Sequence, residues 1–429
     1  MKPKFASAFL FLIIYSSLTF SQWTEINTGF NAYLRSVSAI DDNNVWVCGG
    51  IPPIILRTSN GGLNWINATG SGIHSSVAVT TIFALDNQIV LVSGYTGNGF
   101  NRGFDSAYVF KTINGGSSWS NVFSQDGGFV NGIWMKNSNE GIFIGDPVVN
   151  NYFTIQKTSN GGLNWYSGGS ILGTSGEAGQ INSLAVFGDN VWFGSNTNAK
   201  LYYSSNFGNS WNIQNPPGFV GGVTSIYFAN SSTGMCGGYG SLAITTNGGV
   251  NWNAVTFPST GYVNGLAGNG NWWINTKYGR SVYITSNSGT NWTLEYQIPD
   301  SSLRNHMSKS RNGNLLWDVR SFGKVGKRNT PLSVSQISSQ VPLVCNLEQN
   351  YPNPFNPETK IRFDVIAAGL VKLSVYDING KLISVLTEED LESGKYEVTF
   401  YSDNLATGVY FYKLQSGNFS SFKKMIIVK

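Results

Sequence analysis

The sequence predicts an all-β protein, in which a seven-bladed β-propeller is followed by a small immunoglobulin-like β-sandwich. Three observations support this prediction. An eight-residue motif recurs six times with its tryptophans 40 to 54 residues apart, and short β-rich runs separate the copies. A repeat of this length with strand-like content is typical of β-propellers. Near residue 328 the motif and its strand pattern stop, which indicates a second domain.

The repeated motif reads Thr/Ser-x-Asn-x-Gly-x-x-Trp, and the octapeptide TSNGGLNW occurs twice unchanged. Asn followed by a small residue favours a tight turn, and the Gly fits a backbone conformation that a Cβ would penalise. The Trp on the returning strand can bury a large apolar area. We therefore interpret the motif as a structural hairpin turn. Its Asn and Trp positions are Asn60, Trp65, Asn114, Trp119, Asn160, Trp165, Asn206, Trp211, Asn247, Trp252, Asn287 and Trp292.

Each motif copy belongs to a unit of four predicted strands. A short β-rich run such as PIILRT or AYVFKT precedes the motif, two more runs lie upstream, and a fourth begins at the motif Trp. Short runs separated by polar turn residues are typical of antiparallel strands. Four antiparallel strands per unit form one propeller blade.

The two ends of this region predict one further blade. Residues 302–327 supply three β-rich runs without a motif Trp, and the segment QWTEINTGF, which begins at Gln22, supplies a single run. Pairing the two would close the ring and remove exposed sheet edges. We therefore predict a propeller over 22–327 with seven blades, six and eight being the alternatives.

The motif resembles the Asp-box, or BNR, repeat of sialidases, xyloglucan-degrading enzymes, sortilin-type receptors and photosystem II assembly factors. This resemblance implies a structural motif that lies away from any catalytic centre. All six copies carry Asn where the family usually has Asp, so the turn is retained and its negative charge is lost. Residues 138–211 are also similar to bacterial relatives of the photosystem II assembly factor propellers. That similarity implies the fold of 22–327 and does not transfer the function.

Few residues of the propeller suggest catalysis. The arginines are scattered, and IPPIILR is not the signature that precedes the first Asp-box of sialidases. A glycoside hydrolase needs two carboxylates that flank a cleft. The candidates are Asp146 in GIFIGDPVV, Glu177 in the loop 167–180 and Asp318 in LLWDVR. Each of them can instead cap a strand or a turn, and we favour that structural interpretation.

Other functional classes lack support in the sequence. The two histidines, His74 and His306, do not form an HExxH pattern, so we predict no metal site and no cofactor. Three cysteines in a chain of 429 residues give no disulfide framework. The formal net charge of +4 is small and dispersed, which argues against a nucleic-acid partner.

The N-terminus predicts a secretory signal peptide over 1–21. Two lysines precede a short apolar run, and small residues precede a cleavage site between Ser21 and Gln22. No later segment is long and apolar enough to span a bilayer as a helix. The sequence therefore predicts an exported protein.

The C-terminal part predicts a linker over 328–345 and a β-sandwich over 346–429. An Asn379-Gly380 turn between alternating strands supports the sandwich. The segments NYPNPFNP, VYDINGKLI, GVYFYKL and KKMIIVK resemble the type A sorting domain of the type IX secretion system. The resemblance implies transport through the periplasm to the surface or the outside of a Gram-negative bacterium, with the type IX machinery as a partner.

Together these features favour an exported, non-catalytic binding module. Its ligand would be a protein or a glycan held by the loops over the central channel of the propeller. A glycoside hydrolase that uses Asp146, Glu177 or Asp318 is the first alternative. An assembly factor or scaffold for another exported complex is the second.

Overall fold

The computed structural model confirms the all-β fold. Its described residues form nine four-stranded sheets and two short 3-10 helices, η1 (Val149–Asn151) and η2 (Ser321–Gly323). No helix in this part of the chain has the length and apolarity needed to cross a membrane. The predicted cleavage site at Ser21 and Gln22 lies outside the described residues. The structure describes residues 23–97, 106–197, 199–257, 261–269, 271–285, 287–312, 315–329, 334–338, 340–356, 358–402 and 405–428.

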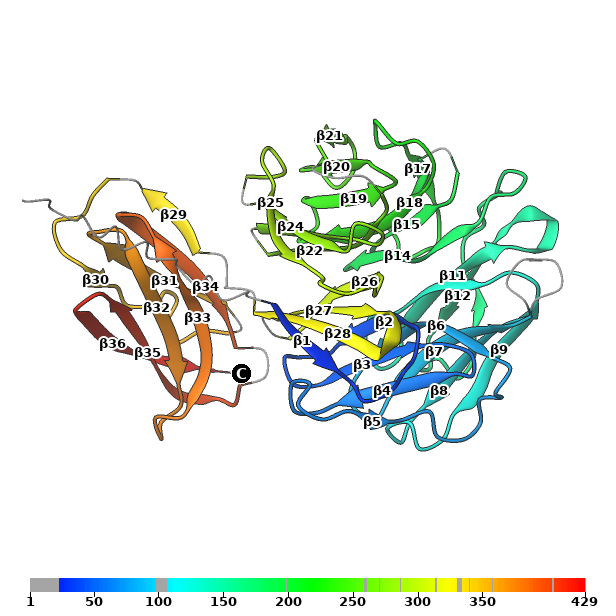
Figure 1. Ribbon diagram of the computed structural model, residues 1–429, viewed down its shortest axis with the longest axis horizontal. Coiled ribbons are helices and arrows are strands. Elements are labelled where there is room, and N and C mark those ends of the chain that lie inside the picture. Colours follow the sequence, from blue (N-terminus) through cyan, green and yellow to red (C-terminus); the bar gives the residue numbers. More distant parts are fainter. Residues whose placement is uncertain are drawn as a thin grey trace, which may run out of the picture.

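Seven of the sheets come from consecutive segments of 23–329 and form a β-propeller (Figure 1). In six of them, four successive strands pair antiparallel in chain order. The first sheet contains β2 (Leu34–Ala39), β3 (Val45–Gly49), β4 (Ile54–Thr58) and β5 (Ile66–Asn67). The second contains β6 (Ala78–Ala84), β7 (Val90–Thr96), β8 (Ser106–Thr112) and β9 (Ser120–Asp126). The third contains β10 (Val130–Met135), β11 (Gly141–Pro147), β12 (Phe153–Thr158) and β13 (Tyr166–Ser167). The fourth sheet contains β14 (Gly179–Phe187), β15 (Asn190–Ser195), β16 (Leu201–Ser204) and β17 (Asn212–Gln214). The fifth contains β18 (Val223–Phe228), β19 (Gly234–Gly238), β20 (Leu242–Thr245) and β21 (Asn253–Val255). The sixth contains β22 (Val263–Asn269), β23 (Asn271–Thr276), β24 (Ser281–Thr285) and β25 (Thr293–Gln297).

The seventh sheet joins the two ends of the propeller. It contains β26 (Arg304–Lys309), β27 (Leu315–Arg320) and β28 (Lys324–Asn329), and its fourth strand is β1 (Trp23–Asn27). In Figure 1 the blue β1 lies beside the yellow β28, and the two are antiparallel. The first strands of neighbouring sheets also contact each other, with β2 touching both β6 and β26. The seven sheets therefore form a closed ring.

The propeller core lies between neighbouring sheets. Seven apolar clusters each join residues of two adjacent sheets. Trp46, Trp192, Trp273 and Trp317, all in second strands, are completely buried in these clusters. The motif residue Trp65 meets Trp317 edge-on from the adjacent sheet, with ring centroids 6.5 Å apart. Much of the aromatic content of the chain is therefore used for packing between blades.

The repeated motifs form hydrogen-bonded turns between third and fourth strands. In the copy at 158–165, Thr158 Oγ1 donates to Asn160 Oδ1 (3.0 Å) and accepts from the amide of Gly162 (2.8 Å). Asn160 Oδ1 also accepts from the amide of Asn164 (3.0 Å). The other five copies repeat this pattern. The Thr or Ser hydroxyl and the Asn oxygen thus satisfy backbone amides that the tight turn leaves without a strand partner.

The C-terminal part forms two four-stranded sheets around one apolar core, which includes Phe363 from one sheet and Leu373 from the other. The first sheet contains, in spatial order, β29 (Val334–Ser338), β34 (Gly394–Tyr401), β31 (Glu358–Val365) and β30 (Asn346–Leu347). The second contains β33 (Leu382–Leu391), β32 (Gly369–Tyr376), β35 (Gly408–Ser416) and β36 (Phe419–Ile427).

Two strands of the structure extend into 328–345, the segment that the sequence predicts as a linker. β28 continues to Asn329, and β29 pairs with β34, placing Val334 opposite Val398. The short run VSQIS becomes an edge strand because β34 still has backbone groups available on that side. The polar composition that suggested a linker is typical of such an edge.

Candidate functional site

The two faces of the propeller carry different loops. In each sheet the first strand begins at one face, which also holds the loops between second and third strands and the connections to the next sheet. We call this the entry face. The opposite face, here the motif face, holds the turns between third and fourth strands, because the four strands are antiparallel and pair in order. All six repeated motifs therefore lie on the motif face.

A cavity of about 680 Å³ lies on the entry face, where the first strands begin. This volume is within the range of known ligand-binding pockets. Aromatic, amide and cationic side chains line it, and none of its described lining residues is Asp or Glu. Its aromatic residues are Tyr33, Tyr95, Phe129, Tyr262 and Tyr278.

Each first strand has a β-bulge near its start, and most of these bulges place a polar side chain in the lining of this cavity. In β10, Val130 pairs with Gly145 and Gly132 with Ile144, so Asn131 has no residue opposite it. The side chain of such a residue does not follow the alternation between the two faces of the sheet and can point in a different direction. The other first strands show a register shift at the same place. Five bulged residues line the cavity, namely Arg35, Asn131, Thr224, Asn264 and Asn305.

The bulge in β14 is longer than the others. Residues 180–183 lie opposite Gly194 alone, whereas the other bulges contain one extra residue. The added length brings Asn182 to β2, which belongs to a sheet that is not adjacent to the sheet of β14 in the ring. Asn182 Oδ1 accepts a hydrogen bond from Ser36 Oγ (2.9 Å), and Nδ2 donates to the carbonyl of Arg35 (3.0 Å). Asn182 therefore bridges the central channel.

Asn182 also lies where two cavities meet. It lines the entry-face cavity and a second cavity of about 480 Å³ within the channel. Its φ of +64° is in the left-handed region, which Asn adopts more readily than most residues. The two hydrogen bonds to β2 hold this conformation. Asn182 thus marks the border between the entry-face cavity and the channel cavity.

Two positive charges face the cavity without a carboxylate beside them. The guanidinium of Arg35 lies over the ring of Tyr33 (5.6 Å to the centroid), and Lys277 Nζ lies over the ring of Tyr278 (5.7 Å). Within the described residues neither cation has an ion-pair partner, and Arg35 Nε is buried without a hydrogen-bond partner. Burial lowers the pKa of Lys277, and the positive charge of Arg35 lowers it further. The cavity is therefore electropositive.

Three exposed tyrosines, Tyr239, Tyr262 and Tyr278, form a cluster at its border. The ring centroids of Tyr239 and Tyr262 are 5.0 Å apart, and those of Tyr262 and Tyr278 are 6.0 Å apart. Their exposed fractions are 53, 39 and 59 %. This tyrosine cluster presents accessible ring faces and hydroxyl groups beside the positive charges.

Asp146, the first of the predicted carboxylates, lies in β11 behind the cavity lining. It is buried, and its Oδ1 accepts hydrogen bonds from Asn131 Nδ2 (2.8 Å) and from the amide of Gly179 (2.9 Å). Both partners line the cavity, whereas Asp146 does not. Its carboxylate therefore positions lining residues of two neighbouring sheets.

Glu177, in the loop before β14, is also buried and bonded. Its carboxylate accepts from the amide and hydroxyl of Thr174 (2.8 Å each), from Lys200 Nζ (2.9 Å) and from the Tyr202 hydroxyl (2.9 Å). Burial alone would raise the pKa of Glu177, but hydrogen bonds from Thr174, Lys200 and Ser195 outweigh it and lower the pKa to about 2. Glu177 is therefore ionised at neutral pH.

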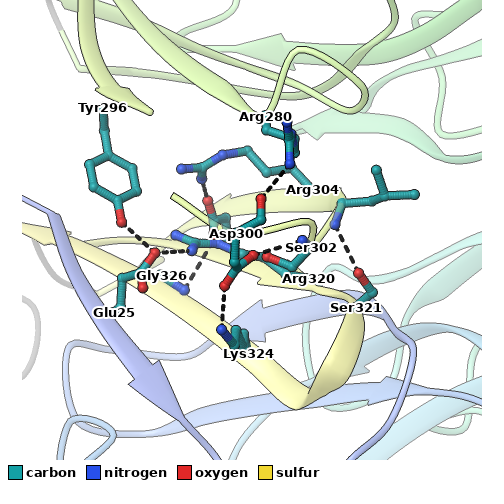
Figure 2. Close-up of polar contacts among 12 residues, drawn as sticks. Glu25, Arg280, Tyr296, Asp300, Ser302, Arg304, Arg320, Ser321, Lys324 and Gly326 are labelled. Carbon is teal, nitrogen blue, oxygen red and sulfur yellow. Dashed lines mark hydrogen bonds and ion pairs between the residues drawn. The ribbon is translucent and has the colours of Figure 1, made fainter. Parts of the chain in front are cut away.

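Asp318, on β27, belongs to a buried charge cluster in the seventh sheet. Its carboxylate pairs with Arg304 and accepts from Arg320 Nε (3.0 Å) and from the amide of Gly326 (2.9 Å). Figure 2 shows the cluster continuing from Arg320 to Glu25 on β1, where Nη1 and Oε1 are 2.7 Å apart. The cluster therefore ties the closing strand to the last sheet.

The three carboxylates are not gathered in one cleft. Asp146 and Glu177 belong to neighbouring sheets and approach each other through the segment that contains Gly179, whereas Asp318 belongs to the seventh sheet. None of the three lines the entry-face cavity.

The sequence contained a signal for the cavity lining that the motif did not reveal. A polar residue interrupts the apolar first strands at a recurring place, as Asn131 does in FVNGIW, Asn182 in QINSLA and Asn264 in YVNGLA. A polar residue repeated inside a buried strand indicates a bulge or a function. Lys277 and Tyr278 follow β23 in a loop and have no such repeat, so only the fold identifies them.

Comparison with known proteins identifies the C-terminal domain. Residues 349–428 match the family described as the secretion system C-terminal sorting domain. No curated protein sequence matches the chain. The sorting domain indicates export through the type IX secretion system to the cell surface or beyond it, as the sequence predicts.

Solved structures share the fold at low sequence identity. One, titled "YCF48 bound to D1 peptide", is 16 % identical with a TM-score of 0.57, and the match covers 74 % of this chain and 98 % of that one. The extracellular domain of a one-component system from B. thetaiotaomicron is 11 % identical with a TM-score of 0.50, over 96 % of this chain and 58 % of that one. A chain of the mitotic checkpoint complex is 13 % identical with a TM-score of 0.52, over 72 % and 94 %. The chain is therefore an exported β-propeller protein whose residues 349–428 form a secretion-system C-terminal sorting domain.

Proposed function

We propose that the propeller is a non-catalytic binding module whose entry-face cavity takes a partner protein or a glycan. One observation carries this proposal: the cavity combines Arg35 and Lys277 with five aromatic residues and several amides, and none of the described residues that line it carries a carboxylate. Convergent polar groups in an aromatic concavity are typical of a binding site. The first strands hold Arg35, Asn131 and Asn264 on a closed ring of sheets, and side chains placed on regular elements form a more precise site than side chains on loops alone.

A glycoside hydrolase is less well supported. It requires one carboxyl group that keeps its proton and a second carboxylate across the same cleft. Glu177 has a pKa near 2 instead of a raised one, and Asp146 and Asp318 are occupied by hydrogen bonds or arginines. These features support structural roles for all three residues.

A role as an assembly factor or scaffold is the same binding role with a protein as ligand. The structure titled "YCF48 bound to D1 peptide" is a propeller of similar fold with a peptide ligand, which supports keeping a peptide among the candidate ligands here. The sorting domain indicates that such a partner would be met at the cell surface or outside the cell.

Glycan and peptide arrays probed with the chain from Gln22 to Lys429 test this proposal. We expect binding that Lys277→Gln weakens. The matched control is Lys136→Gln, which removes the same charge from the far end of a first strand, away from the cavity. Ligands that bind both variants as well as the parent chain would place the binding site elsewhere. If no ligand on either array bound the chain, a binding role for the cavity would be contradicted.

A further inference from the structure

The cations of the entry-face cavity require an explanation that folding does not give. Three buried arginines of the propeller pair with carboxylates: Arg304 and Arg320 with Asp318, and Arg328 with Glu295 (2.6 Å). Arg35 and Lys277 instead lie close enough that the charge of Arg35 lowers the pKa of Lys277, with no carboxylate among the described residues of the cavity. Holding two like charges together in a partly buried site costs stability. A ligand that carries negative charge would offset that cost.

The remaining lining distinguishes between kinds of anionic ligand. Ile181 is the one aliphatic side chain among the described residues that line the cavity. Peptides are usually held through apolar anchor side chains or through main-chain pairing with a sheet edge. The described lining offers one aliphatic anchor, and although each first strand is an edge strand of its sheet, a bulge interrupts the edge at the cavity. The lining is thus poorly suited to a peptide.

The same lining suits a sugar. A pyranose ring has an apolar face of C–H groups that can lie on an aromatic ring, and hydroxyl groups around its edge that pair with amides. The tyrosine cluster supplies exposed rings, and Gln180 and Asn264 supply amides that make no hydrogen bond within the described residues. The bridge formed by Asn182 crosses the channel below the cavity, which favours binding of the end of a chain over threading of a chain through the channel.

We infer that the entry-face cavity binds the end of an acidic polysaccharide, with a sugar carboxylate between Arg35 and Lys277 and a sugar ring on Tyr278. This inference rests on the proposed binding function and specifies its ligand. A guanidinium and an ammonium both form charge-assisted hydrogen bonds with a carboxylate, and these are the stronger kind of hydrogen bond. An uronic acid is the simplest sugar that carries such a group.

The test is calorimetric titration of the chain from Gln22 to Lys429 with short oligosaccharides of galacturonic, glucuronic and mannuronic acid. We expect at least one to bind, and its methyl ester, which is neutral, to bind at least tenfold more weakly. Lys277→Gln should weaken binding of the acid about tenfold and leave binding of the ester little changed. Tyr278→Ala should weaken both. Lys136→Gln, which changes the net charge equally, should have no effect.

Several results would overturn the inference. Equal affinity for acid and ester, with Tyr278→Ala still weakening both, would mean a neutral glycan ligand and would leave the proposed binding function intact. Binding of poly-L-glutamate that needs Lys277 but not Tyr278 would identify an acidic peptide instead. Failure of all three acidic sugars would reject the acidic glycan, while the proposed binding function would fail only if both arrays were also silent.

Discussion

Replacing Asp318 by Asn should destabilise the propeller strongly. Asp318, Arg304 and Arg320 are all completely buried. In the Asn variant, Oδ1 can still accept from Arg320 Nε and from the amide of Gly326, but an NH₂ group replaces the oxygen that pairs with Arg304. Two donors then face each other, and a buried guanidinium loses its counter-charge.

The expected loss follows from these contacts. Removing one partner of a buried ion pair costs about 3 to 5 kcal/mol, because the other charge stays buried without compensation. A loss of that size is a large part of the roughly 5 to 15 kcal/mol that stabilises a typical domain. Urea unfolding followed by tryptophan fluorescence measures it, since Trp317 lies one residue away and Trp23 packs beside Arg304 (5.4 Å from guanidinium carbon to ring centroid).

Asp189→Asn is the matched control. Asp189 also pairs with a cation, Lys136 (2.5 Å), but its side chain is 59 % exposed. A surface pair of this kind contributes less than about 1 kcal/mol. If Asp318→Asn lowered the free energy of unfolding no more than Asp189→Asn does, the cluster would not be what holds the closing strand in place.

Three further predictions concern other parts of the propeller. Thr158→Val leaves the buried amide of Gly162 without its acceptor and should cost about 1 to 3 kcal/mol in urea unfolding, whereas Val at the exposed Thr24 should cost little. Burial lowers the pKa of His306 from 6.5 to about 4, so the folded protein keeps this ring neutral while the unfolded chain protonates it first as the pH falls. The free energy of unfolding should therefore be highest above about pH 6.5 and fall by about 3 kcal/mol as the pH is lowered toward 4. The variant His306→Gln should show a smaller fall over the same pH range. Trp23→Ala removes a buried ring that stacks on Tyr296 (6.2 Å) and should cost about 3 to 5 kcal/mol, with faster amide hydrogen exchange in β28; unchanged exchange there would contradict a closing role for β1.

Local chemistry made most of the propeller predictable. The Thr, Asn and Gly of each motif form hydrogen bonds within a few residues of one another, so a turn could be inferred at each copy without knowledge of the rest of the chain. The alternation of β-rich runs around Trp46 and Trp192 likewise marked second strands. Trp23 could be assigned to a closing strand because a ring needs a fourth strand for its last sheet.

The cavity could not be predicted in the same way. Arg35 and Lys277 are far apart in sequence, and their proximity depends on the curvature of the whole ring. Asn182 crosses the channel only because β14 carries a longer bulge than its neighbours, and a change of register of that kind has no simple sequence signature. The ion pair of Asp318 with Arg304 could not be predicted either, because Arg304 lies on another strand, β26, and only the fold brings the two together.

The position of β1 also imposes an order on assembly. The strand that is synthesised first has to remain unpaired until the last sheet exists, because its partner residues run from Lys324 to Arg328. Joining segments so distant in sequence carries a large loop-closure entropy, which makes this step slow compared with folding inside a blade. A truncated chain would leave two open edges that can recruit other molecules. The ring can therefore close only after the residues of β28, at the end of the propeller, have been made.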